Sequence, residues 1–234
     1  MINPNLYYLG LSLFVLEYIF NFIILSNHYK FREKIASYTL LQIIILTFCL
    51  ILPSIIIPLI IYLLMFHFGE DFRYICNGNA SSRWFGAILF AVNIFFNIES
   101  YTLIFKTFQI REETIQYLLI TCVLLIIPSI IIIPWKIKNI LVALFIFIIG
   151  YCKIIFGLVP YIVFIHMPLT IYRLNKNNII YPFLAIISLI PLTIFIKSIL
   201  FTSTIYTSIY FKYQLAGIII THILFISYWK LKHL

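Results

Sequence analysis

Three ionisable side chains lie inside long apolar runs of this sequence, where they could pair with one another, bind an ion or hold a ligand. Glu17, Glu99 and Lys153 fall at comparable distances past the start of their apolar runs. A helix rises about 1.5 Å per residue, so three helices that run in the same direction would bring these side chains to a similar depth in a membrane. Charged groups at that depth usually face inward and pair. We therefore predict a Glu99–Lys153 ion pair between neighbouring helices, with Glu17 nearby or protonated.

A polar stripe accompanies Glu99 on the same apolar segment, residues 84–106. Asn93, Asn97 and Ser100 follow helical spacing, which puts their side chains on one face of a helix. A polar stripe in a membrane is costly unless other helices satisfy it, so we expect this segment to be the central, protein-surrounded helix of a bundle. These polar groups then either fix how the helices pack or form a site for a ligand, an ion or a switch. The same two interpretations apply to the predicted Glu99–Lys153 ion pair.

The other metal-ligating and catalytic residue types show no recognised spacing. The sequence holds no HExxH, GxSxG, P-loop or GxGxxG motif, and its four cysteines lack CxxC spacing. His166 and His222 are expected at different depths, which argues against a shared haem or metal ion. His222 falls within an apolar run and is either a hydrogen-bonded packing residue or part of the polar site. We therefore predict no cofactor and no metal site, and the missing motifs favour a protein that is not an enzyme.

The composition places the chain in the membrane class. Hydrophobic residues make up 64% of its 234 residues and charged residues 10%, and the mean hydropathy is +1.11. A soluble domain is about half apolar and a quarter charged. The formal net charge of +9 is spread over loops and termini and forms no basic block. This distribution indicates contact with the headgroups of a lipid bilayer and argues against nucleic acid as a partner.

The apolar runs are long enough to cross a bilayer as helices. We predict an all-α, polytopic transmembrane helix bundle that forms a single transmembrane domain over residues 1–234, with seven helices as the best count and six to eight as the range. The stretch 197–213 is rich in Thr, Ser and Tyr, and its pattern fits both a loop and helix ends. The expected helices cover residues 6–25, 38–65, 84–106, 115–135, 140–165, 179–200 and 214–229.

Prolines occur inside four of these expected helices, at Pro53, Pro128, Pro160 and Pro191. A proline in the middle of a helix removes a backbone hydrogen bond and kinks the helix. Kinked helices suit a protein that shifts between two packings. The alternative is that these prolines have no functional role, because proline is common in membrane helices.

The distribution of Lys and Arg predicts the orientation of the chain. The loops after the first, third and fifth expected helices and the C-terminal tail together hold more Lys and Arg than the other loops. This favours an N-terminus outside and a C-terminus in the cytoplasm. Asn79-Ala80-Ser81 is an N-glycosylation sequon in a loop that this orientation places outside. The plasma membrane or an endomembrane is favoured, and the inner membrane of an organelle is the alternative.

Four local features of the sequence carry a resemblance to a known family. They are HYKFREKIASYTLL at 28–41, Cys76 ahead of Trp84, FFNIESYTLIFKTFQI at 95–110 and VPYIVFIHMPLTIYRLNKN at 159–177. These stretches resemble the seven-helix, G-protein-coupled-receptor-like membrane proteins of fungi and amoebae. The resemblance implies a disulfide at Cys76 on the outer side. It also implies that Tyr101, Lys106 and Arg111 face the cytoplasm near a G protein.

The sequence thus favours a receptor-like membrane protein. It would bind an unknown ligand from the outer side, near Glu99 and Lys153, and signal by shifts of Pro-kinked helices around the central polar helix. The alternative is a non-catalytic subunit of an organellar membrane complex or a transporter-like membrane protein. A glycosylated Asn79 would exclude an organelle-encoded subunit, whereas co-purification with a respiratory complex would exclude the receptor.

Overall fold

The computed structural model describes residues 35–107, 109–151, 158–174 and 178–201, together with positions 12, 15, 16, 19, 220 and 224. Every regular element within these residues is helical, which confirms the predicted all-α class. The chain forms two compact units, residues 1–47 with 159–222 and residues 48–158 with 223–234. The elements are α3 Ile35–Ile51, α4 Pro53–Ile75, η1 Ala80–Trp84, α5 Phe85–Thr107, α6 Glu112–Leu124, α7 Ile126–Ile132, α8 Ile137–Tyr151, α9 Leu158–Tyr161, η3 Ile162–His166, α10 Met167–Leu174 and α11 Ile180–Phe201.

Four stretches of the described residues are long and apolar enough to cross a membrane, which is compatible with an integral membrane protein. They are Ser54–Ile75, Ala80–Glu99, Glu112–Ile132 and Ile180–Ser198. Shorter apolar helices accompany them at Thr39–Phe48, Ile137–Tyr151 and Ile162–Arg173. The count of seven spans stays a prediction, because the expected helices 6–25 and 214–229 lie almost wholly outside the described residues.

The expected helix 38–65 is divided into α3 and α4, which meet at Leu52 and Pro53. Leu52 has φ −128° and ψ 53°, outside the helical region, and Pro53 is the first residue of α4. Proline lacks the amide hydrogen that a helix interior needs, but it fits the first turn of a new helix. The kink expected at Pro53 is therefore confirmed as a helix break.

Helix α4 continues to Ile75, although we expected a loop from residue 67 onward. The loop prediction was wrong because the polar residues of this segment follow helical spacing. Glu70 pairs with Arg73 three residues later, and the buried rings of Phe68 and Phe72 are four residues apart on the opposite face. An amphipathic segment of this kind stays helical despite its charges.

Leu125 divides the expected helix 115–135 into α6 and α7. Pro128 lies in the first turn of α7, where its missing amide hydrogen leaves no helical bond unmade. The interruption is slight, since the amide of Leu125 still donates to the carbonyl of Thr121 and the amide of Ser129 donates to the carbonyl of Leu125. The expected helix is therefore interrupted only slightly, at Leu125, three residues before Pro128.

The two remaining prolines differ from each other. Pro160 belongs to α9, the single turn that ends at Tyr161 and precedes the π-helical turn η3. A π-helical turn inserts an extra residue into the hydrogen-bond ladder and interrupts a helix. Pro191 instead lies inside α11, which continues without a break from Ile180 to Phe201. Among these four prolines, Pro191 is therefore the one that lies within an unbroken helix.

Helix α10 occupies a segment that we expected to be a loop, residues 167–178. Its buried residues Met167, Thr170 and Ile171 follow helical spacing. This face packs against α11 and η3. The loop prediction failed because the polar residues near Arg173 hid a short amphipathic helix.

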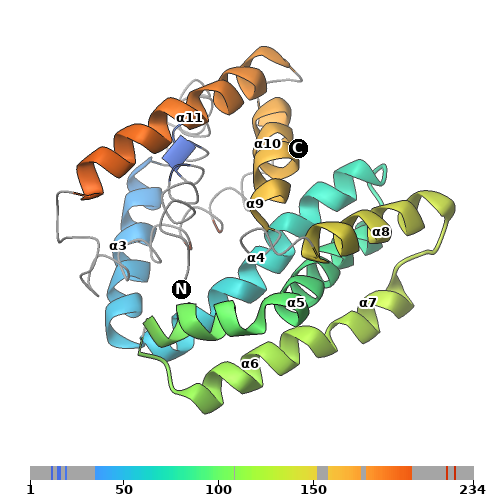
Figure 1. Ribbon diagram of the computed structural model, residues 1–234, viewed down its shortest axis with the longest axis horizontal. Helices are drawn as coiled ribbons and strands as arrows, with labels where there is room; N and C mark the ends of the chain where they lie inside the picture. The colour runs from blue at the N-terminus through green and yellow to red at the C-terminus, as the bar shows by residue number, and fades with distance from the viewer. Residues whose placement is uncertain are drawn as a thin grey trace. The chain divides into compact units, whose positions relative to one another are not determined.

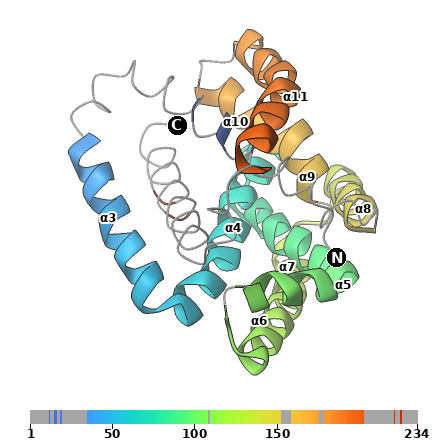
Figure 2. The ribbon, with the colours of Figure 1, turned by 60° about the vertical axis from the view of Figure 1, so that its left-hand side comes forward.

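Helix α5 is the central element of the unit that spans residues 48–158. It packs against α4, α6, α7 and α8, and both ribbon views show it alongside the α6–α7 pair (Figures 1 and 2). Two glycines allow this close packing. A Cβ at Gly86 would lie 2.0 Å from the carbonyl oxygen of Met65 in α4, and a Cβ at Gly150 in α8 would lie 2.6 Å from a methyl group of Val92. Residues 85–94 of α5 are therefore enclosed as predicted, whereas the part that contains Glu99 is partly exposed and is not surrounded by the described residues of this unit.

Candidate functional site

Asn93 is fully buried within α5. Among the described residues, neither its side-chain nitrogen nor its side-chain oxygen has a hydrogen-bond partner. Its neighbours in sequence include Phe90 and Ile94, which are also buried and apolar. An amide left unpaired in such surroundings costs about 1–3 kcal/mol. The first polar residue of the stripe is therefore enclosed but unsatisfied, and the interhelical hydrogen bond considered from the sequence is not formed within the described part of the chain.

The helical path of α5 is interrupted at Asn97, the next polar residue of the stripe. Asn97 has φ −133° and ψ 28°, which are not helical values. Its side-chain nitrogen donates a hydrogen bond to the backbone carbonyl oxygen of Asn93 at 3.0 Å. Asparagine side chains compete with the backbone for hydrogen bonds in this way. The break divides α5 into residues 85–96 and 98–107.

Glu99 lies just past this break, on the wall of a groove between α5 and α6. The groove has a volume of about 500 Å³, within the range of about 300–1,000 Å³ that is usual for small-molecule sites. Its lining residues are Ile98, Glu99, Thr102, Leu103 and Lys106 of α5, with Glu112, Gln116, Leu119 and Ile120 of α6. The predicted site residue Glu99 thus borders a real concave surface.

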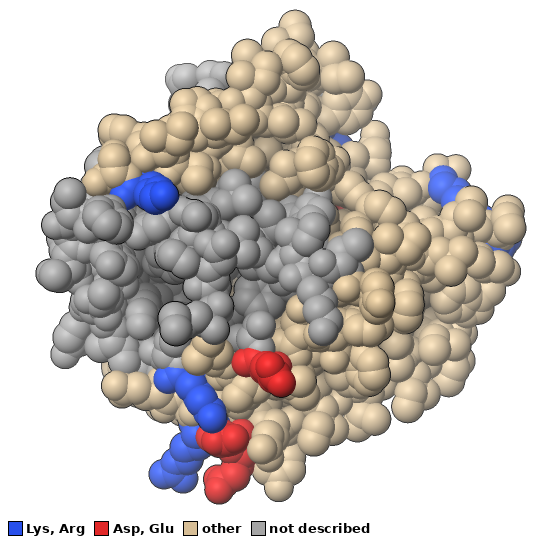
Figure 3. Space-filling view, in the orientation of Figure 1, with Lys and Arg blue, Asp and Glu red and all other residues tan. Residues whose placement is uncertain are grey.

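The charges of the groove are unevenly placed. Lys106 pairs with Glu112 at 3.0 Å, at the end where α5 and α6 are joined. Figure 3 shows acidic side chains together at the lower edge of the visible face beside basic ones, with further basic side chains elsewhere on that face. Glu99 is exposed, and it forms no ion pair with any described residue. The groove therefore holds one neutralised pair and one carboxylate without a counter-charge from the described residues.

Three of the predicted site residues lie outside the residues that the structure describes. They are Glu17, Lys153 and His222. The Glu99–Lys153 ion pair therefore stays a prediction. His166 is buried at the end of η3, and its ring stacks near that of Tyr161 with 6.4 Å between the ring centres.

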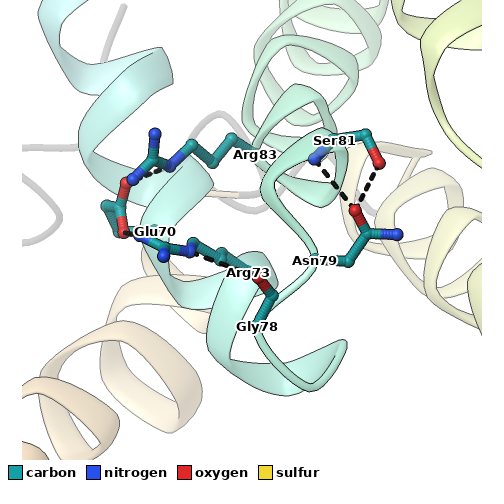
Figure 4. A network of polar contacts seen from close by, with 6 residues as sticks. All are labelled: Glu70, Arg73, Gly78, Asn79, Ser81 and Arg83. Atoms are coloured by element: carbon teal, nitrogen blue, oxygen red, sulfur yellow. Dashed lines mark hydrogen bonds and ion pairs between the residues drawn. The ribbon is translucent and has the colours of Figure 1, made fainter.

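The sequon residue Asn79 precedes the short helix η1 and is exposed. Its side-chain oxygen accepts hydrogen bonds from the backbone nitrogen of Ser81 at 3.1 Å and from the Ser81 hydroxyl at 2.6 Å. Figure 4 shows both contacts from close by. This capping arrangement satisfies an otherwise unpaired amide at the helix start. The side-chain nitrogen of Asn79, to which a glycan would be attached, takes no part in these bonds.

A charged network joins the end of α4 to η1. Glu70 forms ion pairs with Arg73 at 3.6 Å and with Arg83 (Figure 4). The Nε of Arg73 also donates to the carbonyl oxygen of Gly78 at 3.5 Å. The carboxylate of Glu70 is the more enclosed member, with 13% of its side chain exposed. The network therefore fixes the connection between α4 and α5 and leaves Asn79 at the surface.

Two expectations that came from the family resemblance need correction. Cys76 is a free thiol that donates to the side-chain oxygen of Asn139 at 3.3 Å, so it forms no disulfide. Tyr101 is buried, because its ring belongs to the apolar core of the unit rather than to an exposed face. Lys106 and Arg111, in contrast, are exposed.

No residue pattern in the sequence predicts the polar contact between α4 and α6. The hydroxyl of Tyr62 reaches the side chains of Thr121 and Cys122. Cys122 is fully buried. A single hydroxyl on an apolar helix cannot be assigned a partner until the neighbouring helices are known. The spacing of Glu99 and Lys106, two turns apart on one helix face, was the one signal that could have revealed the groove wall.

Comparison with protein-family models, with curated proteins and with solved structures finds no match to this chain. Within the described residues, no group of three His, Cys, Asp or Glu side chains is arranged to hold a metal ion. The functional assignment therefore depends on the geometry of α5 and its groove.

Proposed function

We propose that this chain is a receptor-like integral membrane protein that binds a ligand beside α5 and signals by shifts of its interrupted helices. The observation that carries the proposal is the break in the central helix at Asn97, immediately before the groove residue Glu99. A ligand in that groove would contact the part of α5 that follows the break. Ligand binding could then change the angle between the two parts of the helix, because a ligand shifts a conformational equilibrium by binding one state more tightly.

The interruptions elsewhere in the chain support this proposal. A helix break lies at Leu52, a π-helical turn at 162–166 and a slight interruption at Leu125. Each allows neighbouring helical segments to adjust without unfolding either segment. A receptor needs such segments, whereas a rigid structural subunit does not.

For topology we propose an N-terminus outside, a cytoplasmic C-terminus and a glycan on Asn79. The proposal rests on the loop charges and on the exposed, capped position of the sequon. Expression in cultured cells followed by glycosidase treatment tests it. We expect the mobility of the wild-type chain to change on deglycosylation and that of Asn79→Gln and Ser81→Ala to stay unchanged. Identical mobility of all three chains before and after treatment would contradict the glycan.

The experiment that tests the receptor assignment is purification from native membranes in mild detergent, with the bound proteins identified and quantified. A receptor is recovered without stoichiometric membrane partners. A subunit of an organellar membrane complex, the alternative function, is recovered with a fixed set of partners in equal amounts. Recovery of such a set would overturn the receptor assignment.

We propose a cytoplasmic G protein as the effector, since the exposed residues Lys106 and Arg111 lie near the α5–α6 turn. Guanine nucleotide exchange in membranes that contain the chain and a G protein tests this. We expect exchange above that of membranes with Lys106→Ala and Arg111→Ala combined. Equal exchange in the two preparations, at equal protein levels, would exclude this partner.

A further inference from the structure

The groove between α5 and α6 has a simple internal order that follows from its helices. The two helices are joined by the short connection around Gln109, which has a positive φ of 57°. Residues at equal distances from this connection lie at the same height. Lys106 therefore faces Glu112, as their 3.0 Å ion pair shows. By the same count, we infer that Glu99, seven residues before Lys106, lies at the height of Leu119, seven residues after Glu112, and both residues line the groove.

This order separates the two charged positions. Seven residues of helix correspond to about 10 Å of rise, so the Glu99 carboxylate is too far from the Lys106 ammonium for direct pairing. The α6 residues that line the groove beyond Glu112 are Gln116, Leu119 and Ile120. The Glu99 side chain is exposed and pairs with no described residue, so a cation can reach its carboxylate from the open side of the groove.

The kind of cation is restricted by the lining. A metal ion such as Ca²⁺ takes six to eight oxygen ligands, and Mg²⁺ takes six. The far end of the groove offers the carboxylate of Glu99 and the hydroxyl of Thr102, which already donates to the carbonyl oxygen of Ile98 at 2.9 Å. Gln116 of α6 adds one amide, and the other lining residues of this end are apolar. An organic ammonium group with an apolar body fits this surface, because it needs one anionic partner and gains from apolar contact.

We propose that the α5–α6 groove binds an amphiphilic organic cation, with its ammonium group on Glu99 and its apolar body against Leu119 and Ile120. The inference rests on the proposed receptor function, since it names the class of ligand. An anionic ligand is disfavoured, because Glu112 already neutralises Lys106. The volume of about 500 Å³ accommodates a chain or ring system of small-molecule size.

Equilibrium binding to the purified full chain in lipid nanodiscs tests the proposal. The probe is radiolabelled n-octylammonium, and n-octanol and n-octanoate are its neutral and anionic counterparts. Empty nanodiscs measure partition into lipid. We expect saturable binding of n-octylammonium above the empty nanodiscs and none for the other two compounds. Equal binding of all three, or no binding above the empty nanodiscs, would overturn the proposal.

Matched variants locate the site. Glu99→Gln should weaken n-octylammonium binding by about 10-fold or more, because a charge-assisted hydrogen bond is lost. Glu113→Gln removes the same charge from an exposed position of α6 outside the groove and should leave binding unchanged. Ile120→Trp should fill the groove and weaken binding, whereas Leu124→Trp, exposed on the same helix, should not. Equal losses in Glu99→Gln and Glu113→Gln would overturn the proposed site.

The ligand class and the receptor function can fail separately. Binding that depends on Glu99 in a chain recovered as a stoichiometric complex subunit would keep the ligand class and remove the receptor function. If the chain is recovered alone and glycosylated but does not bind n-octylammonium, the receptor function stands and the proposed ligand class is excluded.

Discussion

The side-chain nitrogen of Asn97 donates a hydrogen bond to the backbone carbonyl oxygen of Asn93, 3.0 Å away on the preceding turn of α5. Asn97 also has non-helical dihedral angles. The central helix of its unit is therefore interrupted by its own polar stripe and without a proline. The break therefore lies directly beside the α5–α6 groove. This position connects the two steps of the proposed mechanism, ligand binding in the groove and a change of angle between the two parts of α5.

The two buried asparagines of this unit should respond oppositely to replacement by leucine. Asn93 has no side-chain partner within the described residues, so Asn93→Leu should stabilise the chain by about 1–2 kcal/mol. Asn139 accepts from Cys76 and donates to the carbonyl oxygen of Pro134 at 2.5 Å, so Asn139→Leu should destabilise it by a similar amount. Thermal unfolding in the same detergent measures both. A loss of stability in both variants would show that Asn93 has a partner.

The two packing glycines should tolerate alanine to different degrees. A Cβ at Gly86 meets the backbone oxygen of Met65 at 2.0 Å, which only a shift of α4 can relieve. Gly86→Ala should therefore cost about 3 kcal/mol or more. A Cβ at Gly150 meets a side-chain methyl of Val92, which has more freedom to adjust, so Gly150→Ala should cost about 1 kcal/mol. Size-exclusion profiles and unfolding midpoints check the order, and equal losses would argue against the α4–α5 contact.

The ion pairs of this unit should differ in their contribution to stability. Glu70 has 13% of its side chain exposed and contacts two arginines, so Glu70→Gln should destabilise the chain by about 1–3 kcal/mol. Lys106 and Glu112 have 48% and 58% of their side chains exposed. Glu112→Gln should therefore cost less than about 1 kcal/mol, and the loss should shrink in high salt. Chemical denaturation at low and high salt compares the two, and a larger loss for Glu112→Gln would refute the assigned roles.

The sequence predicted the helical class and the enclosed position of residues 85–94, because long apolar runs favour buried helices. It did not predict that Glu99 and several later residues of segment 84–106 are exposed. It also located the break at Pro53 through the chemistry of proline. It did not locate the break at Asn97, since an asparagine interrupts a helix only where its side chain captures a backbone carbonyl. The groove was not predicted either. Its two walls belong to α5 and α6, which the connection around Gln109 brings together, and no local sequence pattern shows this.

The helix end at Ile75 was also not predicted from the sequence. Polarity in 67–75 suggested a loop, yet the Glu70 and Arg73 pair and the buried ring of Phe72 keep the segment helical. Spacing was a better guide there than composition.

Backbone amide exchange of α5 tests the central claim most directly, with the wild-type chain and Asn97→Leu compared in lipid nanodiscs. Leucine favours a helix by about 0.5 kcal/mol over asparagine and has no side-chain donor to compete for the carbonyl of Asn93. We predict that residues 98–107 of the wild type exchange at least about 10-fold faster than residues 85–96, because they open separately from the rest of the helix. In Asn97→Leu the difference should disappear. Uniform exchange over residues 85–107 in the wild type, or an identical pattern in both chains, would contradict the claim that α5 moves in two parts about Asn97.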